Sequence, residues 1–582
     1  MKNISTIALL SLSLAGHSQA VDEKTAQSAT KPNVIFFALD DLNDWINPLG
    51  YEQAITPNYN RLANSGVTFT NAHAPSTYCA PSRTAIFTGL QASTTGCYGN
   101  EIYHYDFPDL VPLQVAFKLG GYNAWGAGKL FHHRGGYVDL RGWNEYFARS
   151  REIIDAGYET GAYGSDYLLP DPYPYSPYYR ETDNEITGGR FMEWGPIPDS
   201  LEEKITATIR TNWVVDLLKQ THEKPFFIGL GLYHPHYPNY VPQKYFDMYD
   251  LEQIQLPNHD PAHLDDLPAN IRNQMLNRRR IHLEVLLELG IYKDAVRAYL
   301  AAVTYTDAML GRVLDALEDS DYKDNTIVVV WSDHGYHLGE KGQWGKHTLW
   351  RETSRVPLIF AGADLAKDKK VETTVGLIDL YPTLIELCDL PQQHQMDGVS
   401  LVPVLKEPEL AEERNLFIPG HIRERYAVIN SNYRYIKYEK NIGEEFYDLK
   451  EDPYEWNNLA GDQKYESIIE EMKKAVPAIF SPEATPRNDL KLIIEGDGFR
   501  WEPKNVSVPE LNNSKSFGVY PVPANEILYI NAYMAVENYK IVDIFGKVVI
   551  EERSNKNSID ISGLQSGLYF IQVNDEVTRF IK

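Results

Sequence analysis

Three apolar runs bounded by turn-forming residues mark the first two thirds of the chain, at residues 34–39, 225–233 and 326–331. Their length, without alternating polar positions, is typical of strands buried on both faces of a parallel sheet. Residues 295–318 carry apolar side chains at three- and four-residue spacing, which predicts a helix with one face against that sheet. Alternating strands and helices over residues 31–390 therefore predict an α/β layered domain.

The pattern changes twice beyond residue 390. Shorter strand-like pieces at 426–429 and 433–438, with a helical stretch near 463–475, predict a smaller C-terminal α+β subdomain over residues 391–505. Residues 514–582 contain short alternating strands separated by Gly and Asn turns, which predict a small β-sandwich. A chain of 582 residues agrees with two or three such folding units.

The N-terminus has the pattern of an export signal. Lys2 precedes an apolar run at residues 7–14, and Ser18 and Ala20 are small residues at the two positions that a signal peptidase recognises. The run is too short to cross a bilayer, so residues 1–20 are predicted to be a signal peptide, followed by a flexible lead-in at 21–30. A short buried helix is the alternative.

Charge and cysteine content narrow the functional classes. The chain has 55 Lys and Arg against 80 Asp and Glu, a formal net charge of −25, which argues against nucleic acid as a partner and against a polybasic membrane patch. Any site for an anion must then be a local cationic pocket. Only three cysteines occur, Cys79, Cys97 and Cys388, so the fold is not a disulfide-stapled scaffold, and the odd count requires another role for at least one sulfur.

Reactive side chains follow the predicted strands. Asp40 and Asp41 end the first, and Asp333 and His334 follow the third. Ligands of open α/β sheets bind outside the carboxyl ends of the strands, so these side chains are expected to converge. Three carboxylates and one imidazole predict a divalent-cation site that favours calcium or magnesium over zinc. Taken alone, paired aspartates also occur in solvated loops and helix caps.

Cys79 lies at a predicted helix start, because Pro81 is favoured in a first helical turn and residues 82–87 continue a helix. A side chain there meets the positive end of the helix dipole and free amide groups that also attract anions. An inert buried cysteine is the alternative. The basic residues Arg83, Lys129 and Lys346 are candidates for binding an oxyanion. The histidines His132 and His234 are candidates for moving protons.

The core Cys79-Ala80-Pro81-Ser82-Arg83, with Thr88-Gly89, resembles the signature of type I sulfatases, and residues 31–505 resemble their iduronate-2-sulfatase-like group. Further matches in the family's order are residues 121–132, 234–236, 332–335, 355–358 and 446–459. Ala124 stands where the family's second signature, at residues 121–132, usually has Ser or Thr. His334 stands where many sulfatases have Asn, and a histidine at this position agrees with the iduronate-like group. The resemblance implies the sulfatase/alkaline-phosphatase-like mixed sheet flanked by helices.

The resemblance also implies a mechanism. Cys79 would be oxidised to formylglycine (3-oxoalanine) by a formylglycine-generating or anaerobic sulfatase-maturating enzyme, and an oxygen of the aldehyde hydrate would attack sulfur. Ca2+ would be bound by the modified Cys79 and by Asp40, Asp41, Asp333 and His334. Arg83 and Lys129 would hold the hydrate, Lys346 and His234 would meet the sulfate and its leaving oxygen, and His132 would be the base that lets the hemiacetal expel sulfate.

The last seventy or so residues resemble the C-terminal sorting domain of Bacteroidetes type IX secretion, through the runs Y-P-V-P-A-N, D-I-F-G-K and S-G-L-Y-F-I-Q-V and a basic end. This resemblance implies a protein exported through the periplasm and secreted or held at the cell surface by the type IX machinery. A carbohydrate-binding sandwich is the alternative interpretation.

The substrate expected from these features is a sulfated oligo- or polysaccharide, with ulvan favoured over fucoidan, carrageenan and glycosaminoglycans. A Tyr-rich insertion at 158–194 offers rings suited to sugars, although it could equally pack upon itself. Two other functions are the alternatives. A phosphohydrolase of the alkaline phosphatase superfamily disagrees with the C-x-P-S-R core and the single predicted metal site, and a non-catalytic glycan-binding homologue disagrees with the complete set of reactive groups.

Overall fold

The computed structural model describes residues 31–132, 137–147, 194–258, 261–278, 280–485, 489–495, 498–503 and, with short gaps, 517–582. The chain divides into two compact units, Met1–Thr485 and Pro486–Lys582, each described here by itself. The predicted signal peptide and lead-in, residues 1–30, lie outside the described residues, as does the Tyr-rich insertion up to residue 193.

An eight-stranded mixed sheet forms the centre of the first unit, in the order β13-β2-β12-β9-β1-β7-β4-β5. The three predicted apolar strands are confirmed as β1 (Asn33–Asp40), β7 (Phe226–Pro235) and β9 (Thr326–Ser332). β1 is buried along its whole length and pairs in parallel with β7 on one side and β9 on the other. Beyond β7, the parallel part continues with β4 (Asn123–Gly128) and β5 (Glu145–Phe147). Beyond β9 come β12 (Leu358–Ala361), β2 (Gly66–Phe69) and β13 (Lys369–Val371). Of these, β12 runs antiparallel to both of its neighbours.

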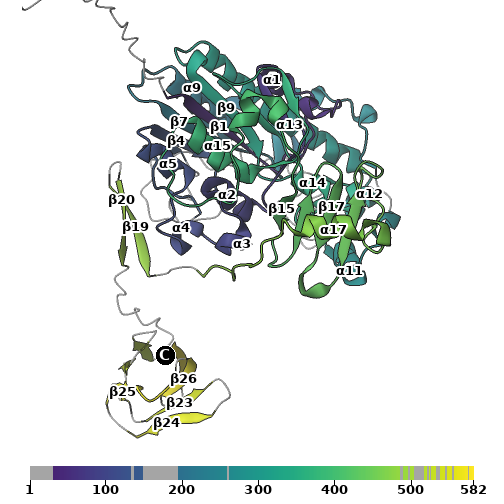
Figure 1. Cartoon of the computed structure of the whole chain (residues 1–582). Helices are drawn as coiled ribbons and strands as arrows, with labels where there is room; N and C mark the ends of the chain where they lie inside the picture. The colour runs from purple at the N-terminus through teal and green to yellow at the C-terminus, as the bar shows by residue number, and fades with distance from the viewer. Residues whose placement is uncertain are drawn as a thin grey trace, which may run out of the picture. The chain divides into compact units, whose positions relative to one another are not determined.

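Helices cover both faces of this sheet because successive residues of β1 point to opposite sides (Figure 1). Ile35, Phe37 and Leu39 pack in one apolar cluster with α1 (Pro57–Asn64), α9 (Thr206–Leu218) and α13 (Tyr292–Glu318). Val34, Phe36 and Ala38 pack in the other, with α2 (Cys79–Thr88), α5 (Leu113–Leu119) and α15 (Leu380–Leu387). The helix predicted at 295–318 is confirmed as α13, three residues longer at its start.

The smaller α+β part is also confirmed, as a four-stranded antiparallel sheet of β15 (Leu416–Pro419), β16 (Tyr426–Ile429), β17 (Tyr433–Lys437) and β18 (Glu444–Asp448). One face packs on Leu349 and Trp350, and the other packs on α17 (Glu466–Lys473) through Ile469 and Met472. This sheet belongs to the same compact unit as the central sheet.

Short elements complete the first unit. They are β3 (Ala72–His73), β6 (Trp194–Ile197), β8 (Asn239–Pro242), β10 (His337–Leu338), β11 (Trp344–Gly345), β14 (Val375–Gly376), α3 (Ala92–Thr95), α4 (Tyr103–Asp106), α10 (Gln243–Asp247), α11 (Ala269–Arg278), α12 (Arg280–Glu288), α14 (Arg351–Ser354) and α16 (Val402–Lys406).

The second unit is rich in β-structure, as predicted. After the hairpin of β19 (Leu490–Glu495) and β20 (Gly498–Pro503), a three-stranded and a four-stranded antiparallel sheet share one apolar core that includes Leu528, Ile541 and Ile571. Their strands are β21 (Phe517–Tyr520), β22 (Ile527–Ala532), β23 (Tyr539–Asp543), β24 (Val548–Glu552), β25 (Ser558–Asp560), β26 (Leu568–Val573) and β27 (Glu576–Ile581). Within the described part of the chain, no helix has the length and apolar character needed to span a bilayer.

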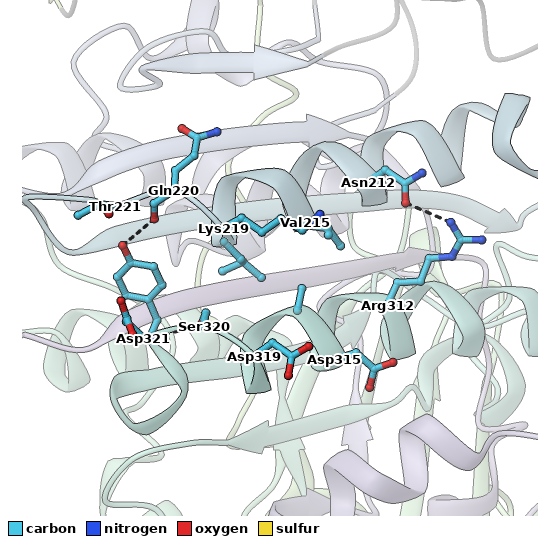
Figure 2. A pocket seen from close by; sticks show the side chains of 13 residues that line it. Asn212, Val215, Lys219, Gln220, Thr221, Arg312, Asp315, Asp319, Ser320 and Asp321 are labelled. Atoms are coloured by element: carbon cyan, nitrogen blue, oxygen red, sulfur yellow. Dashed lines mark hydrogen bonds between the residues drawn. The ribbon is translucent and has the colours of Figure 1, made fainter.

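One hollow of about 640 Å³ lies between the C-terminal ends of α9 and α13 (Figure 2). Arg312 donates a hydrogen bond to Asn212 across it (3.1 Å), and the hydroxyl of Tyr322 donates to the carbonyl of Gln220 (2.8 Å). β7 and β9 begin just after these helix ends, so the hollow faces the amino ends of the strands. The predicted site residues lie at the opposite, carboxyl ends.

Candidate active site

The parallel register of β1 and β9 brings four of the five predicted metal ligands together. Leu39 pairs with Ser332, so the Asp40-Asp41 and Asp333-His334 segments leave the sheet side by side. The Oδ1 atom of Asp333 accepts hydrogen bonds from the backbone N–H groups of Asp41 (3.2 Å) and His334 (2.9 Å). The side chains of all four residues are buried.

Asp41 turns its carboxylate into the site through a left-handed backbone conformation, with φ of 63°. This conformation costs a residue other than glycine about 1–2 kcal/mol. The buried hydroxyl of Tyr299, on α13, supports the turn: it donates to the carbonyl of Asp41 (2.7 Å) and accepts from the backbone N–H of Asn43 (3.1 Å).

Cys79 is the first residue of α2, as predicted, and its thiol is buried. Its Sγ atom lies 3.2 Å from Nε2 of His334, 3.2 Å from Nζ of Lys346 and 3.7 Å from Oδ1 of Asp40. The structure therefore places this side chain between the strand ends and a cation, at the positive end of a helix.

The donor set at this point suits a divalent cation. Ligand atoms of Asp40, Cys79, Asp333 and His334 all lie within 4.8 Å of one another, the one such group found in the part of the chain that the structure describes. Oδ2 of Asp41 is also buried beside them and has no hydrogen-bond partner among the described residues. A metal ion is one partner that can satisfy a buried carboxylate oxygen without a donor, and here four other ligand atoms lie beside it. Mostly oxygen ligands favour a hard cation.

Three buried or nearly buried cations face the three carboxylates. Nε of Arg83 lies 2.9 Å from Oδ2 of Asp333, and Nζ of Lys346 lies 2.7 Å from Oδ1 of Asp41. The ammonium of Lys129 pairs with Asp40. All three cations had been predicted to share the site, and the structure brings them together there.

These charges set the protonation of the site. Burial alone would raise the pKa of Asp40, but Lys129 and the other cations hold that pKa well below its usual value. Burial raises the pKa of Asp41, which also faces two other carboxylates. Burial alone would lower the pKa of His334, but the Asp333 carboxylate and the Cys79 thiol together raise it to about 9. A divalent cation bound by the same atoms would displace that proton.

Lys129 reaches the site because two strands approach closely at glycines. A Cβ atom on Gly231 would lie 2.2 Å from the carbonyl carbon of Lys129, and Gly128 has a left-handed φ of 71°. The N–H of Lys129 donates to the carbonyl of Gly231 (2.8 Å), which fixes the residue at the carboxyl end of β4. Its ammonium also lies 4.9 Å from the ring centre of Tyr233.

Two histidines end β7. His234 is buried against the ring of Tyr305, and burial lowers its pKa to about 4, so it is neutral at pH 7. Nε2 of His236 lies 3.8 Å from Oδ2 of Asp41. Sequence reasoning gave a role only to His234, although the repeated histidine of the His-Pro-His run was the available signal for His236.

His132 is buried and follows β4 by four residues. Its ring contacts Tyr78, the residue before Cys79, at 5.9 Å between ring centres. On its other side Tyr78 contacts His347 (4.6 Å), which in turn contacts His421 (4.8 Å) from the loop after β15. These rings form an arc beside Cys79. Tyr78, His347 and His421 were missed because no local pattern distinguishes them, and only tertiary packing brings His421 here.

Comparison with protein families agrees with this geometry. Residues 32–390 match the sulfatase family, and residues 339–479 match the C-terminal domain of N-sulphoglucosamine sulphohydrolase. Residues 518–582 match the secretion system C-terminal sorting domain, as the sequence predicted.

Individual proteins give the same result. A sulfatase of Formosa agariphila is 39% identical, covering 78% of this chain and 89% of its own, and human iduronate 2-sulfatase is 28% identical over 76% and 80%. An ulvan-active sulfatase of Formosa agariphila is 25% identical over 85% and 91%. Among solved structures, a phosphonate monoester hydrolase of Silicibacter pomeroyi superposes with a TM-score of 0.59 at 20% identity, covering 81% of this chain and 99% of that one, which shows a shared fold.

The family matches cover most of the first unit and include every residue that converges at the carboxyl ends of β1, β4, β7 and β9. A cysteine at the start of α2, three carboxylates and three cations meet there. The chain belongs to the sulfatase family and is a sulfuric ester hydrolase that carries a C-terminal sorting domain.

Proposed function

We propose that this enzyme removes sulfate from a sulfated polysaccharide, or from its oligosaccharides, by a formylglycine- and calcium-dependent reaction. The observation that supports the proposal best is the position of Cys79, whose Sγ lies 3.2 Å from both Lys346 and His334 at the N-terminus of α2. An anionic sulfate ester at this point would meet a helix N-terminus and several cations.

Cys79 is the residue that would be converted to formylglycine, which supplies a hydrate oxygen as nucleophile. Its surroundings fit this role, since Arg83 and Lys129 are held nearby by Asp333 and Asp40 and can orient an oxygen-bearing side chain. Conversion requires a formylglycine-generating or anaerobic sulfatase-maturating enzyme as a partner. The thiols of Cys97 and Cys388 are buried elsewhere, and burial raises both of their pKa values.

Ca2+ is the proposed metal, held by Asp40, Asp41, Asp333 and His334 with the side chain at position 79. Bound there, it would supply positive charge to the sulfate oxygens. Calcium suits the ligand set because three of the five protein ligands are carboxylates, and carboxylate oxygens are its usual ligands.

The surrounding side chains would bind the sulfate and move protons. Burial alone would lower the pKa of Lys346, but Asp41 and the other anions raise it well above its usual value, so this ammonium stays charged and can bind a sulfate oxygen. His234 is the proposed donor to the leaving sugar oxygen. It is neutral when buried, and an anionic ester beside it would raise its pKa and promote uptake of the proton. His132, which contacts the ring of Tyr78 beside Cys79, is the proposed base for the later step.

A sulfated sugar is the substrate class that these features favour. The arc of Tyr78, His347 and His421 offers flat rings and imidazole hydrogen-bonding groups beside Cys79, which suits a pyranose. Of the relatives named above, one is named for iduronate and another for activity on ulvan. We therefore infer an algal polysaccharide, with ulvan as the first candidate.

The sorting domain at residues 518–582 supports export through the periplasm and the type IX machinery to the cell surface or the medium. An extracellular position agrees with a polymeric substrate, which cannot enter the cell. The predicted signal peptide at residues 1–20 would start this route.

One experiment tests the nucleophile and the activity together. The protein is expressed in a host with a maturation enzyme, the peptide that contains Cys79 is analysed by mass spectrometry, and sulfate release is measured on ulvan, fucoidan, carrageenan and glycosaminoglycan oligosaccharides. Full activity with an unmodified thiol would contradict the mechanism. Faster cleavage of matched sugar phosphates would contradict the reaction class.

Two cysteine variants provide the comparison. Cys79→Ala is expected to abolish sulfate release while circular dichroism stays unchanged. Cys97→Ala, which removes an equally buried thiol away from the strand ends, is expected to retain activity. Retained turnover in Cys79→Ala would show that another group attacks sulfur.

A further inference from the structure

A second cavity, of about 540 Å³, lies beside the site and contains none of its proposed catalytic groups. We call it the aromatic cavity; its lining includes Asp44, Trp45, Arg351, Glu352, Tyr454 and Trp456. Two of its walls are continuous with the metal site. Asp44 follows Asp41 in the same loop, and the carbonyl of Glu352 lies so close to Gly335 that a Cβ there would be 2.0 Å from it. A volume in this range suits a small organic ligand.

Stacked aromatic rings form part of the wall and rim of this cavity. Tyr454 stacks on Trp456 (5.1 Å between ring centres, 22° between planes), and Trp456 stacks on His263 (4.4 Å, 18°). Another pair, Trp45 and Tyr51, stacks at 4.4 Å and 6°. Tyr454 remains 47% exposed although its neighbours hold the ring stack in place. An exposed, preorganised ring is a platform for the apolar face of a sugar.

The polar groups of the cavity are suited to hydroxyl ligands. Asp44 binds the guanidinium groups of both Arg351 (2.6 Å) and Arg355 (3.0 Å), so each of these cations already has a carboxylate partner. Oε2 of Glu352 is buried and accepts no hydrogen bond from the described residues; the nearest basic atom, Nδ1 of His337, is 3.9 Å away. A buried carboxylate oxygen requires a donor, and a sugar hydroxyl would supply one.

Protonation and geometry argue against a metal ion here. Burial, with repulsion from Glu455, raises the pKa of Glu352 to about 7, and burial with repulsion from Glu352 raises that of Glu340 to about 8. The carboxylates of the cavity do not converge on one point as the metal ligands of the active site do, within the described residues. Neutral or singly charged acids spread around a cavity suit hydroxyl groups instead.

We propose that the aromatic cavity is a second sugar-binding subsite, which holds a neighbouring residue of the glycan whose sulfate ester lies in the active site. The inference rests on the proposed function, because it requires a glycan substrate. Tyr454 and Trp456 stack against the sugar ring, and Glu352 and Glu340 bind its hydroxyl groups. The enzyme would then favour chains longer than one sugar.

The test compares substrates of different length. The kcat/KM of the mature enzyme is measured on sulfated mono-, di-, tetra- and hexasaccharides of each glycan that it desulfates. Tyr454→Ala and Trp456→Ala are expected to lower the ratio of kcat/KM on the hexasaccharide to that on the monosaccharide by about 5- to 10-fold, the effect of losing one stacked ring. Tyr529→Ala, which removes a tyrosine of similar exposure (40%) in the second unit, should leave this ratio unchanged.

Binding separates failure of the subsite from failure of the proposed function. Desulfated hexasaccharides of the same glycans are titrated into the Cys79→Ala protein by calorimetry, with and without the Tyr454→Ala change. Weaker binding in the double variant supports the subsite even if no glycan is desulfated. Equal binding, or no binding by either protein, together with an unchanged length ratio, would overturn it.

Discussion

The hydroxyl of Tyr299 is a single group whose removal should disturb the active site without changing the shape of the core. It lies on α13, is fully buried, and donates to the carbonyl of Asp41 (2.7 Å) while accepting from the N–H of Asn43 (3.1 Å). Tyr299→Phe keeps the ring but leaves two buried backbone groups without this partner. Asp41 then holds its left-handed conformation with less support.

The expected magnitude follows from the two lost contacts. An unsatisfied buried polar group costs about 1–3 kcal/mol, so the loss of two partners in Tyr299→Phe should lower the free energy of unfolding by about 2–6 kcal/mol. The misplaced Asp41 carboxylate also stabilises the transition state less well. If this loss of transition-state stabilisation is about 1.4 kcal/mol, kcat/KM falls about tenfold. Urea denaturation and initial rates of sulfate release measure the two quantities.

Tyr59→Phe is the matched control. Tyr59 is equally buried, and its hydroxyl contacts only the side chain of Thr306 (3.1 Å) among the hydrogen bonds found, while Thr306 keeps its own bond to the carbonyl of Val303. This variant should lose about 1 kcal/mol of stability and retain wild-type kcat/KM. The reasoning is refuted if Tyr299→Phe has wild-type kcat/KM, or if both variants lose the same activity.

Three further predictions concern the metal, pH and the C-terminal unit. Chelation with EGTA should abolish sulfate release and lower the melting temperature, and Ca2+ should restore both better than Mg2+; a chelated enzyme with full activity would exclude the metal. Burial raises the pKa of Asp307 from 3.8 to about 6, so the folded state binds the proton more tightly, and its contribution to stability is present below pH 4 and is lost between pH 4 and 6. This loss amounts to about 3 kcal/mol, and Asp307→Asn should flatten the denaturation profile over that window, whereas an unchanged slope would disprove the assignment. Deletion of residues 517–582 should leave sulfate release intact and retain the protein inside the cell envelope, as measured by fractionation; undiminished export would contradict the sorting role.

Strands buried on both faces were the easiest elements to predict, because nearly all of their residues are apolar. β1, β7 and β9 consist almost wholly of apolar residues, so their runs stood out and their ends located Asp40 and Asp333. The start of α2 was equally visible, because Pro81 restricts where a helix can begin. Both kinds of signal are local in sequence.

Contacts between distant segments left no such signal. Tyr299 is one of many apolar and aromatic residues on α13, and nothing in the helical pattern shows that its hydroxyl meets Asp41. β12 is a short buried run whose antiparallel direction depends on its partners. These features arise from tertiary packing rather than from periodicity.

The charge distribution explains how a protein of net charge −25 can bind an anionic polymer. Its long-range field repels a sulfated chain, but such a field decays over about 8 Å at physiological salt and over less in more concentrated salt. The ion pairs of Arg83, Lys129 and Lys346 are buried or nearly so, where mobile ions screen them little. Salt therefore weakens the repulsion more than the local attraction. Because the three cations already neutralise three carboxylates, the dication proposed for the site would give it the excess positive charge that a sulfate ester requires.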